Sequence, residues 1–232
     1  MLKVYWILAM MFSCAAQSPA PGGLTGTLTG SDGTPITGGT LSLSSTRIPP
    51  RNPSGRPSLQ AGPYVTRSGA GGTLRFEQLP AGSYLVCAQA PRNQWLGSCD
   101  WGAKPQIVSV AAGVTGNLSV VLRKGALVPI RVDDPNRTLS QSQAKGLLVG
   151  VGGDDKLFRP AVLLSEDAGG RTYESLIPFD FPVKLVLASP SFQLANEQGT
   201  PLPAKTTVIT YTAPAAQTPP AVRVIVTGAR VP

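Results

Sequence analysis

Short runs of alternating apolar and polar residues, separated by glycine and proline, make up most of this chain. In the clearest run Tyr84, Val86 and Ala88 fall on one face of an extended segment, and the residues between them fall on the other. Just before this run stand Pro80, which fixes φ, and Gly82, which tolerates a positive φ. The pattern predicts a strand end, a corner, and a second strand with one buried face.

Residue types that interrupt helices, 26 Gly and 23 Pro, are spread along the whole chain. After residue 16, no segment keeps a helical apolar period for three turns without meeting one of them. Thr, Val, Ser and Leu fill the intervening segments, a composition typical of strands and turns. We therefore predict an all-β fold, with strands at residues 24–29, 39–44, 74–76, 84–91, 107–110, 118–122, 127–132, 147–151, 183–190, 206–212 and 222–226.

The first sixteen residues differ from the rest. Lys3 is followed by an apolar run at 4–12 and by small residues at 13–16. This order predicts a secretory signal peptide, residues 1–16, cleaved after Ala16 and followed by a linker at 17–23. The run is shorter than the roughly 20 residues that span a bilayer, so we expect no transmembrane segment in the mature chain. A lipid anchor at Cys14 is the alternative, although residues 11–13 match a lipobox only in part.

Cleavage would leave Cys87 and Cys99, an even pair in an oxidising compartment. We expect a local disulfide between them, which would stabilise the fold by about 3 kcal/mol on the chain-entropy model. Two buried free thiols are the alternative.

Catalytic and metal-binding functions find little support in the sequence. The chain has no histidine to act as a general base or a zinc ligand, and it has no Gly-x-Ser-x-Gly elbow. Carboxylates occur in adjacent pairs at 133–134, 154–155 and 166–167, which could contribute to a calcium site. Because no spaced aspartate pattern accompanies them, solvated turns are favoured. We expect a non-enzyme with no catalytic residues, no metal and no cofactor.

Two motifs resemble a known family. Residues 26–29 read Gly-Thr-Leu-Thr and 32–41 read Asp-Gly-Thr-Pro-Ile-Thr-Gly-Gly-Thr-Leu, while 76–84 read Phe-Glu-Gln-Leu-Pro-Ala-Gly-Ser-Tyr. They resemble the motifs of carboxypeptidase regulatory-like domains over about residues 22–124. The resemblance implies a non-catalytic, prealbumin-like sandwich of seven strands, an architecture shared with starch-binding-like modules and Cna-B pilin repeats. No lysine occurs between Lys3 and Lys104, so we predict no Cna-B isopeptide cross-link in the first domain.

A weak internal repeat predicts a second domain. The glycine pair at 71–72 and the motif at 76–80 are echoed by a glycine pair at 169–170 and by residues 173–178. Each copy is followed by an alternating apolar strand that ends in proline. We therefore expect two antiparallel β-sandwich domains in tandem, at 24–124 and 125–232, the second a diverged copy of the first. The connection at 123–126 is short, which favours a restricted relative orientation.

Four arginines lie in a proline-rich and glycine-rich stretch at 47–72: Arg47, Arg51, Arg56 and Arg67. They could form a basic arm for an anionic partner such as an acidic polysaccharide or a membrane headgroup. A mobile loop kept soluble by its charge is the alternative, and it is favoured.

Trp95 and Trp101 flank Cys99 in one loop. Exposed aromatic rings pinned by a disulfide could stack against sugar rings, as in carbohydrate-binding modules. The alternative, which is favoured, is that both tryptophans cover the end of the core and shield the disulfide.

Together these patterns predict a secreted, non-catalytic binding or interaction module. We expect it to be secreted, periplasmic or on the cell surface, with a polysaccharide or a cell-envelope protein as partner. The net charge is +8, but few aromatics, no nucleic-acid motif and an export signal argue against nucleic acid. A carbohydrate-binding module using Trp95 and Trp101 is one alternative, and a structural or adhesive spacer of the cell envelope is another.

Overall fold

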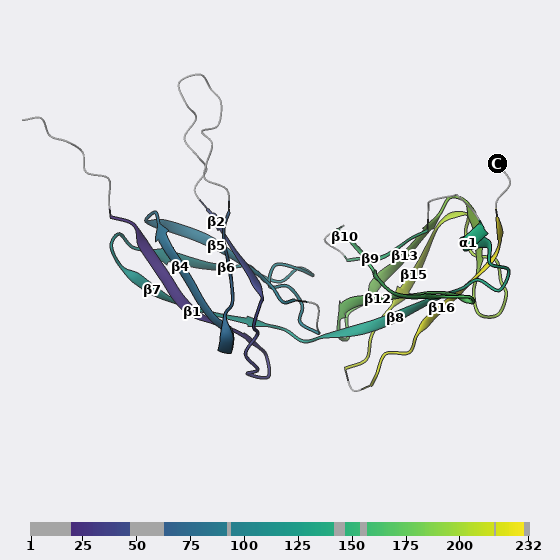
Figure 1. The fold of residues 1–232 in the computed structure, drawn as a ribbon, viewed down its shortest axis with the longest axis horizontal. Coiled ribbons are helices and arrows are strands. Elements are labelled where there is room, and N and C mark those ends of the chain that lie inside the picture. Colours follow the sequence, from purple (N-terminus) through teal and green to yellow (C-terminus); the bar gives the residue numbers. More distant parts are fainter. Residues whose placement is uncertain are drawn as a thin grey trace, which may run out of the picture.

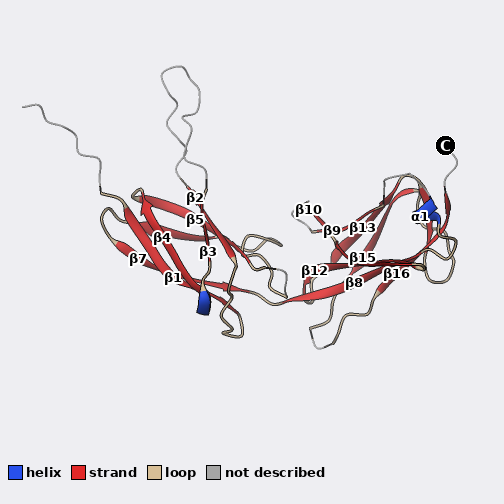
Figure 2. Cartoon of the chain, viewed as in Figure 1, coloured by secondary structure: helices blue, strands red, loops and turns tan. Residues whose placement is uncertain are grey.

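The computed structural model describes residues 20–46, 63–91, 94–141, 147–153, 157–215 and 217–229. Within these residues the helical pieces are a 3-10 helix at Ala70–Gly72 and the four-residue helix α1 at Thr138–Gln141 (Figure 2). Everything else is strand, turn or loop, so the all-β prediction is confirmed. The strands form two β-sandwiches that lie end to end, with the start of β1 and the end of β16 at opposite ends (Figure 1).

The first sandwich packs a three-stranded sheet, in the order β4-β1-β7, against a four-stranded sheet, in the order β3-β2-β5-β6. Its strands are β1 (Gly22–Gly30), β2 (Thr40–Ser45), β3 (Tyr64–Arg67), β4 (Thr73–Leu79), β5 (Gly82–Gln89), β6 (Gln106–Val110) and β7 (Thr115–Leu122). Strand β3 lies in the stretch 47–72, which we expected to be a loop. It pairs with β2 as an edge strand.

The second sandwich packs a five-stranded sheet, in the order β11-β12-β8-β16-β14, against a four-stranded sheet, in the order β10-β9-β13-β15. Its strands are β8 (Gly125–Asp133), β9 (Leu148–Gly152), β10 (Phe158–Pro160), β11 (Val162–Asp167), β12 (Gly170–Pro178), β13 (Val183–Ser189), β14 (Phe192–Ala195), β15 (Lys205–Tyr211) and β16 (Val222–Ala229).

The two sandwiches share one topology. In the first, β1 pairs antiparallel with β4 and parallel with β7. In the second, β8 pairs antiparallel with β12 and parallel with β16. Strands β2, β5 and β6 form one sheet in the same order as β9, β13 and β15. In each sandwich the first and last strands therefore pair in parallel, while the other strand pairs among the described residues are antiparallel.

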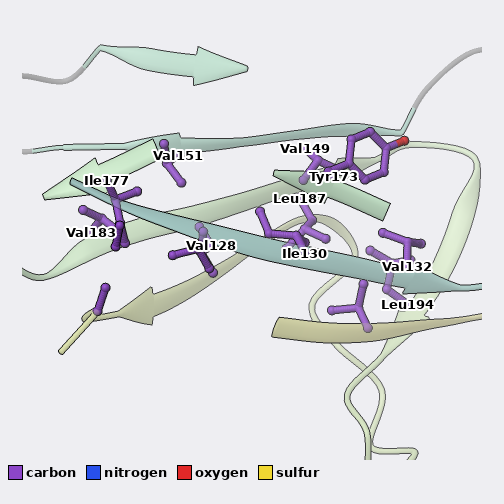
Figure 3. Packing of buried hydrophobic residues seen from close by; sticks show 14 of the residues in the cluster. Val128, Ile130, Val132, Val149, Val151, Tyr173, Ile177, Val183, Leu187 and Leu194 are labelled. Atoms are coloured by element: carbon purple, nitrogen blue, oxygen red, sulfur yellow. The ribbon is translucent and has the colours of Figure 1, made fainter. Parts of the chain in front are cut away.

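Two hydrophobic cores follow from this arrangement. The alternation in β5 has the expected effect, because Tyr84, Val86 and Ala88 are all buried in the first core. In the second core, apolar side chains of β8 such as Ile130 meet residues of the opposite sheet such as Leu187 (Figure 3).

The corner between β4 and β5 carries the chain from one sheet of the first sandwich to the other. The hydroxyl group of Tyr84 donates a hydrogen bond of 2.7 Å to the carbonyl oxygen of Pro80 and holds this corner. The positive φ falls on Gln78 (55°) rather than on Gly82, so the expected role of Gly82 is corrected.

Candidate functional site at the domain junction

The connection between the two sandwiches is itself hydrogen-bonded. Only Arg123 and Lys124 separate β7 from β8. The amide of Leu96 donates to the carbonyl oxygen of Arg123 (2.8 Å), and the amide of Gly125 donates to that of Gln94 (2.7 Å). These bonds pair the connection with residues 94–103, which we call the junction loop. The connection therefore behaves as part of a small paired segment rather than as an open linker.

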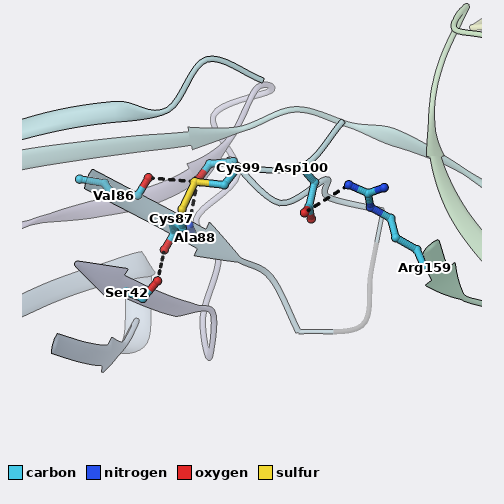
Figure 4. Close-up of a disulfide and its surroundings, with 8 residues drawn as sticks. Ser42, Val86, Cys87, Ala88, Cys99, Asp100 and Arg159 are labelled. Atoms are coloured by element: carbon cyan, nitrogen blue, oxygen red, sulfur yellow. Dashed lines mark hydrogen bonds and ion pairs between the residues drawn. A yellow bond between two sulfur atoms is a disulfide. The ribbon is translucent and has the colours of Figure 1, made fainter. Parts of the chain in front are cut away.

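A disulfide fixes the junction loop to the first domain. Cys87 on β5 is bonded to Cys99, with 5.4 Å between their Cα atoms, as the sequence predicted (Figure 4). Ser98 adds two hydrogen bonds to β5, because its amide donates to the carbonyl oxygen of Ala88 (2.9 Å) and its Oγ accepts from the amide of Ala88 (2.8 Å). The loop is thus held at its middle by one covalent bond and two hydrogen bonds.

Two tight turns give the loop its path. The amide of Asp100 donates to the carbonyl oxygen of Gly97, and the amide of Ala103 donates to that of Asp100, both over 3.1 Å. Trp101 and Gly102 follow one another with φ values of 57° and 68°. A positive φ is unfavourable for a bulky residue, so burial of the Trp101 ring has to offset this local cost.

Consecutive residues of the junction loop enter different cores. The ring of Trp95 lies against Gly30 of β1 and belongs to the first core. Leu96, only 2% exposed, lies against Gly125 and belongs to the second core. A fully buried leucine contributes roughly 1.5–3 kcal/mol, so this loop adds stabilising contacts to both domains.

Trp101 also belongs to the second core, where it meets a charged partner. The guanidinium carbon of Arg159, on β10, lies 4.2 Å from the centre of the indole ring. An Arg159 nitrogen is also 3.7 Å from a carboxylate oxygen of Asp100 (Figure 4). A cation–π contact and an ion pair therefore join the loop of the first domain to an edge strand of the second.

Both tryptophans singled out in the sequence are buried. Trp95 is 6% exposed and Trp101 is 8% exposed, so neither presents an open ring face to solvent. Of the four loop arginines, Arg67 is exposed on β3. Arg47, Arg51 and Arg56 lie outside the described residues. The structure therefore brings the cysteines and tryptophans together and places Arg67 on a different strand.

The paired carboxylates that the structure describes form hydrogen bonds and ion pairs within the second domain. Asp133 accepts hydrogen bonds from Arg131 (3.0 Å) and Arg223 (2.8 Å), and Asp134 caps α1 by accepting from two backbone amides (2.7 and 2.8 Å). Asp167 accepts two bonds of 2.8 Å from Arg131, which lower the pKa of the Asp167 carboxyl to about 2. The pair at 154–155 lies outside the described residues. In the part of the chain that the structure describes, no three such groups gather where they could hold a metal ion.

A surface hollow of about 470 Å³ opens beside the junction loop. We call it the junction hollow, and its chief lining residues are Ser98, Trp101, Lys104, Gln106, Val121 and Arg123. None of the described residues that line it is an aspartate or a glutamate. The hollow combines two cationic side chains, hydrogen-bonding side chains and apolar surface.

Sequence reasoning missed Leu96, Lys104, Arg123 and Arg159 as residues of this site. Lys104 and Arg123 had a weak signal, because they flank the cysteine-bearing loop and the domain connection. Arg159 had none, since it is far from the loop in sequence and meets Trp101 only through the packing of the two domains.

No family model matches the chain, and no curated protein matches its sequence. Solved structures of similar fold include a streptococcal ancillary pilin, 13% identical, with a TM-score of 0.44 over 90% of this chain and 63% of that one. The minor pilin GBS52 of Streptococcus agalactiae is 12% identical, with a TM-score of 0.44 over 91% of this chain and 98% of that one. A Bacteroides thetaiotaomicron protein proposed to bind polysaccharide is 10% identical, with a TM-score of 0.35 over 79% and 78%.

The chain spans 63% of the ancillary pilin and 34% of a further matched structure, the Bacillus anthracis TIE protein, which is less than two thirds of each. Likeness at this level of identity concerns the fold and does not fix a function. Among the described residues, no helix has the length and apolar character needed to cross a membrane.

Proposed function

We propose that this chain is an exported, non-catalytic interaction module of the cell envelope, in which two β-sandwich domains act as one rigid unit. The observation that carries the proposal is the junction loop, which places Trp95 in one core and Leu96 and Trp101 in the other. A joint with buried side chains on both sides resists bending, whereas two domains on an open linker would move independently.

The disulfide of the first domain supports the exported location. The Cys87–Cys99 disulfide suits an oxidising compartment. The same proposal includes a signal peptide at 1–16, a linker at 17–23 and two domains at 24–124 and 125–232. It also includes membership of the first domain in the carboxypeptidase regulatory-like family. The partner we propose is a polysaccharide or a cell-envelope protein.

The described ends of the chain lie at opposite ends of the molecule (Figure 1). Such a shape suits a module that holds two other elements at a fixed separation. Its outward surfaces and loops remain available for contact, because the residues that build the joint are buried.

The experiment measures distances between spin labels in the mature chain, residues 17–232. Labels are placed at Asn117→Cys on β7 and Thr210→Cys on β15, both exposed positions. A rigid unit gives one narrow distance distribution, and we expect Leu96→Ala to broaden it. A broad distribution in the otherwise unchanged chain would contradict the proposal. A second experiment follows export of the full-length chain, with a chain that lacks residues 1–16 as the control that should stay in the cytoplasm. If the full-length chain also stays in the cytoplasm with residues 1–16 still attached, the proposed location is contradicted.

A further inference from the structure

The junction hollow carries two positive charges that take no part in the contacts between the two domains described above. Lys104 and Arg123 both line it, and neither forms an ion pair within the described residues. The nearest acidic residue of the loop, Asp100, is directed to Arg159 and does not line the hollow. An anion in the hollow would therefore gain two cationic contacts without facing a carboxylate.

The size and the remaining lining restrict the kind of anion. A volume of about 470 Å³ lies within the range of small-ligand sites, roughly 300–1,000 Å³, and exceeds the need of a simple inorganic ion. Apolar surface from Val121 and from the exposed part of Trp101 lies beside the cations. A ligand that fits must combine an apolar face with a negative charge.

Hydrogen-bonding groups in the hollow are held in place by the fold. The Gln106 side-chain amide donates to the carbonyl oxygen of Ser119 (3.2 Å), which leaves its own oxygen as an acceptor. Ser98 Oγ accepts from the amide of Ala88 and can still donate its own proton. A fixed acceptor and a fixed donor suit the hydroxyl groups of a sugar.

We infer that the junction hollow binds a carboxylate-bearing saccharide, one or two uronate units of an acidic polysaccharide. The carboxylate would pair with Arg123 and Lys104, and the apolar face of the pyranose ring would lie over Val121 and the exposed part of Trp101. The inference rests on the proposed function for its polysaccharide partner and deepens it, because it names the chemical class of that polysaccharide and the residues that would hold it. It also differs from the stacking site expected from the sequence, because cations and an aliphatic surface do most of the recognition.

The test uses the mature chain with intact disulfide, titrated calorimetrically at low salt with a galacturonate tetramer. Lys104→Gln with Arg123→Gln should weaken binding at least tenfold. The matched control, Lys184→Gln with Lys205→Gln, removes two exposed lysines of the second domain and should leave binding unchanged. A neutral tetramer, maltotetraose, should bind at least tenfold more weakly than the acidic one. Tryptophan fluorescence should change on binding, because Trp101 lines the hollow.

Three results would overturn the inference: no binding of the acidic tetramer, equal binding of the neutral one, or full binding by the double variant of the hollow. Inorganic phosphate as a competitor identifies a plain anion site if it displaces the tetramer at equal concentration, and that outcome also counts against a saccharide. The spin-label distance, measured in the same double variant, should stay narrow. Failure of this inference is thereby separated from failure of the rigid-unit proposal.

Discussion

The two sandwiches share one strand topology, but they use one equivalent connection in different ways. In the first domain, the chain between β5 and β6 forms the disulfide-bonded junction loop, which leaves its own sandwich. In the second domain, the chain between β13 and β15 forms β14, which returns to pair with β16 of the same domain. One connection builds a joint and the other closes an edge.

This difference makes the two domains unequal in their dependence on each other. Every buried residue of the first core comes from residues 24–122, so the described part of that domain supplies its own interior. The second core includes Leu96 and Trp101 from the first domain. The first domain should therefore keep most of its stability when the second domain unfolds. The second domain should lose stability when the junction loop is altered.

The largest loss of stability should come from removing a buried tryptophan, and the domain that is destabilised should depend on which tryptophan is removed. Trp101→Ala removes a buried ring from the second core, and truncation of a core tryptophan costs about 3–5 kcal/mol. We expect that loss in the free energy of unfolding of the second domain, measured by urea titration with domain-resolved hydrogen exchange. Trp95→Ala is the matched variant and should destabilise the first domain instead. If both variants weaken the same domain, the unequal dependence is wrong.

The next effect concerns the disulfide. Replacing Cys87 and Cys99 with serine opens a ring between residues 12 apart, which should cost the first domain about 3 kcal/mol. Because the loop carries Leu96 and Trp101, the second domain should also lose stability, although by less. Reduction of the unmodified protein is the control and should give the same pattern. An unchanged second domain would show that the loop stays docked without its covalent bond.

The glycine pairs test whether the two sandwiches are equivalent. Gly72 (φ 73°) directly precedes β4, and Gly170 (φ 141°) is the first residue of β12. A Cβ on either would collide with the backbone of that domain's first strand, at Leu28 or Val132. We expect Gly72→Ala and Gly170→Ala to cost about 1–3 kcal/mol each, measured by thermal unfolding. Gly71→Ala is the control, since Gly71 has a similar φ (65°) but open space around it. Gly71→Ala should lower the stability of the first domain less than Gly72→Ala does. An equal loss of stability would show that the collision with Leu28 does not contribute.

Sequence reasoning found most of the central strands, because a sandwich buries one face of each of them. It did not identify β12, a central strand of the second domain, as a strand. In β5 and β13 every second side chain is buried, so the pattern is visible in the sequence. Edge strands lack this signal. All six residues of β11 are exposed, and β10 and β3 have only three and four residues. Their positions follow from pairing with neighbours, which composition does not encode.

The site was predictable only in its local part. Cys87 and Cys99 are close in sequence and share a compartment argument, so their disulfide could be expected. The contacts of Trp101 depend on how one domain packs against the next, and no periodicity reports that packing. The positive φ of Gln78 likewise shows that the tertiary fold, rather than the nearest glycine, decides where the corner bends.

The smallest effect should be a difference in acid sensitivity of the second domain. Two hydrogen bonds from Arg131, and others from backbone amides, lower the pKa of Asp167 from its ordinary value of 3.8 to about 2. A carboxyl whose pKa is lower in the folded than in the unfolded state stabilises the fold, and this contribution is fully present at pH values above the pKa of the unfolded state. That stabilisation falls away as the pH drops through about 2. Carbon NMR of the Asp167 carboxyl should therefore give a midpoint near 2. Asp167→Asn should lower the urea midpoint of the second domain at pH 6, and by much less at pH 2. A midpoint near 3.8, or an equal deficit at both pH values, would show that Arg131 does not hold the charged form.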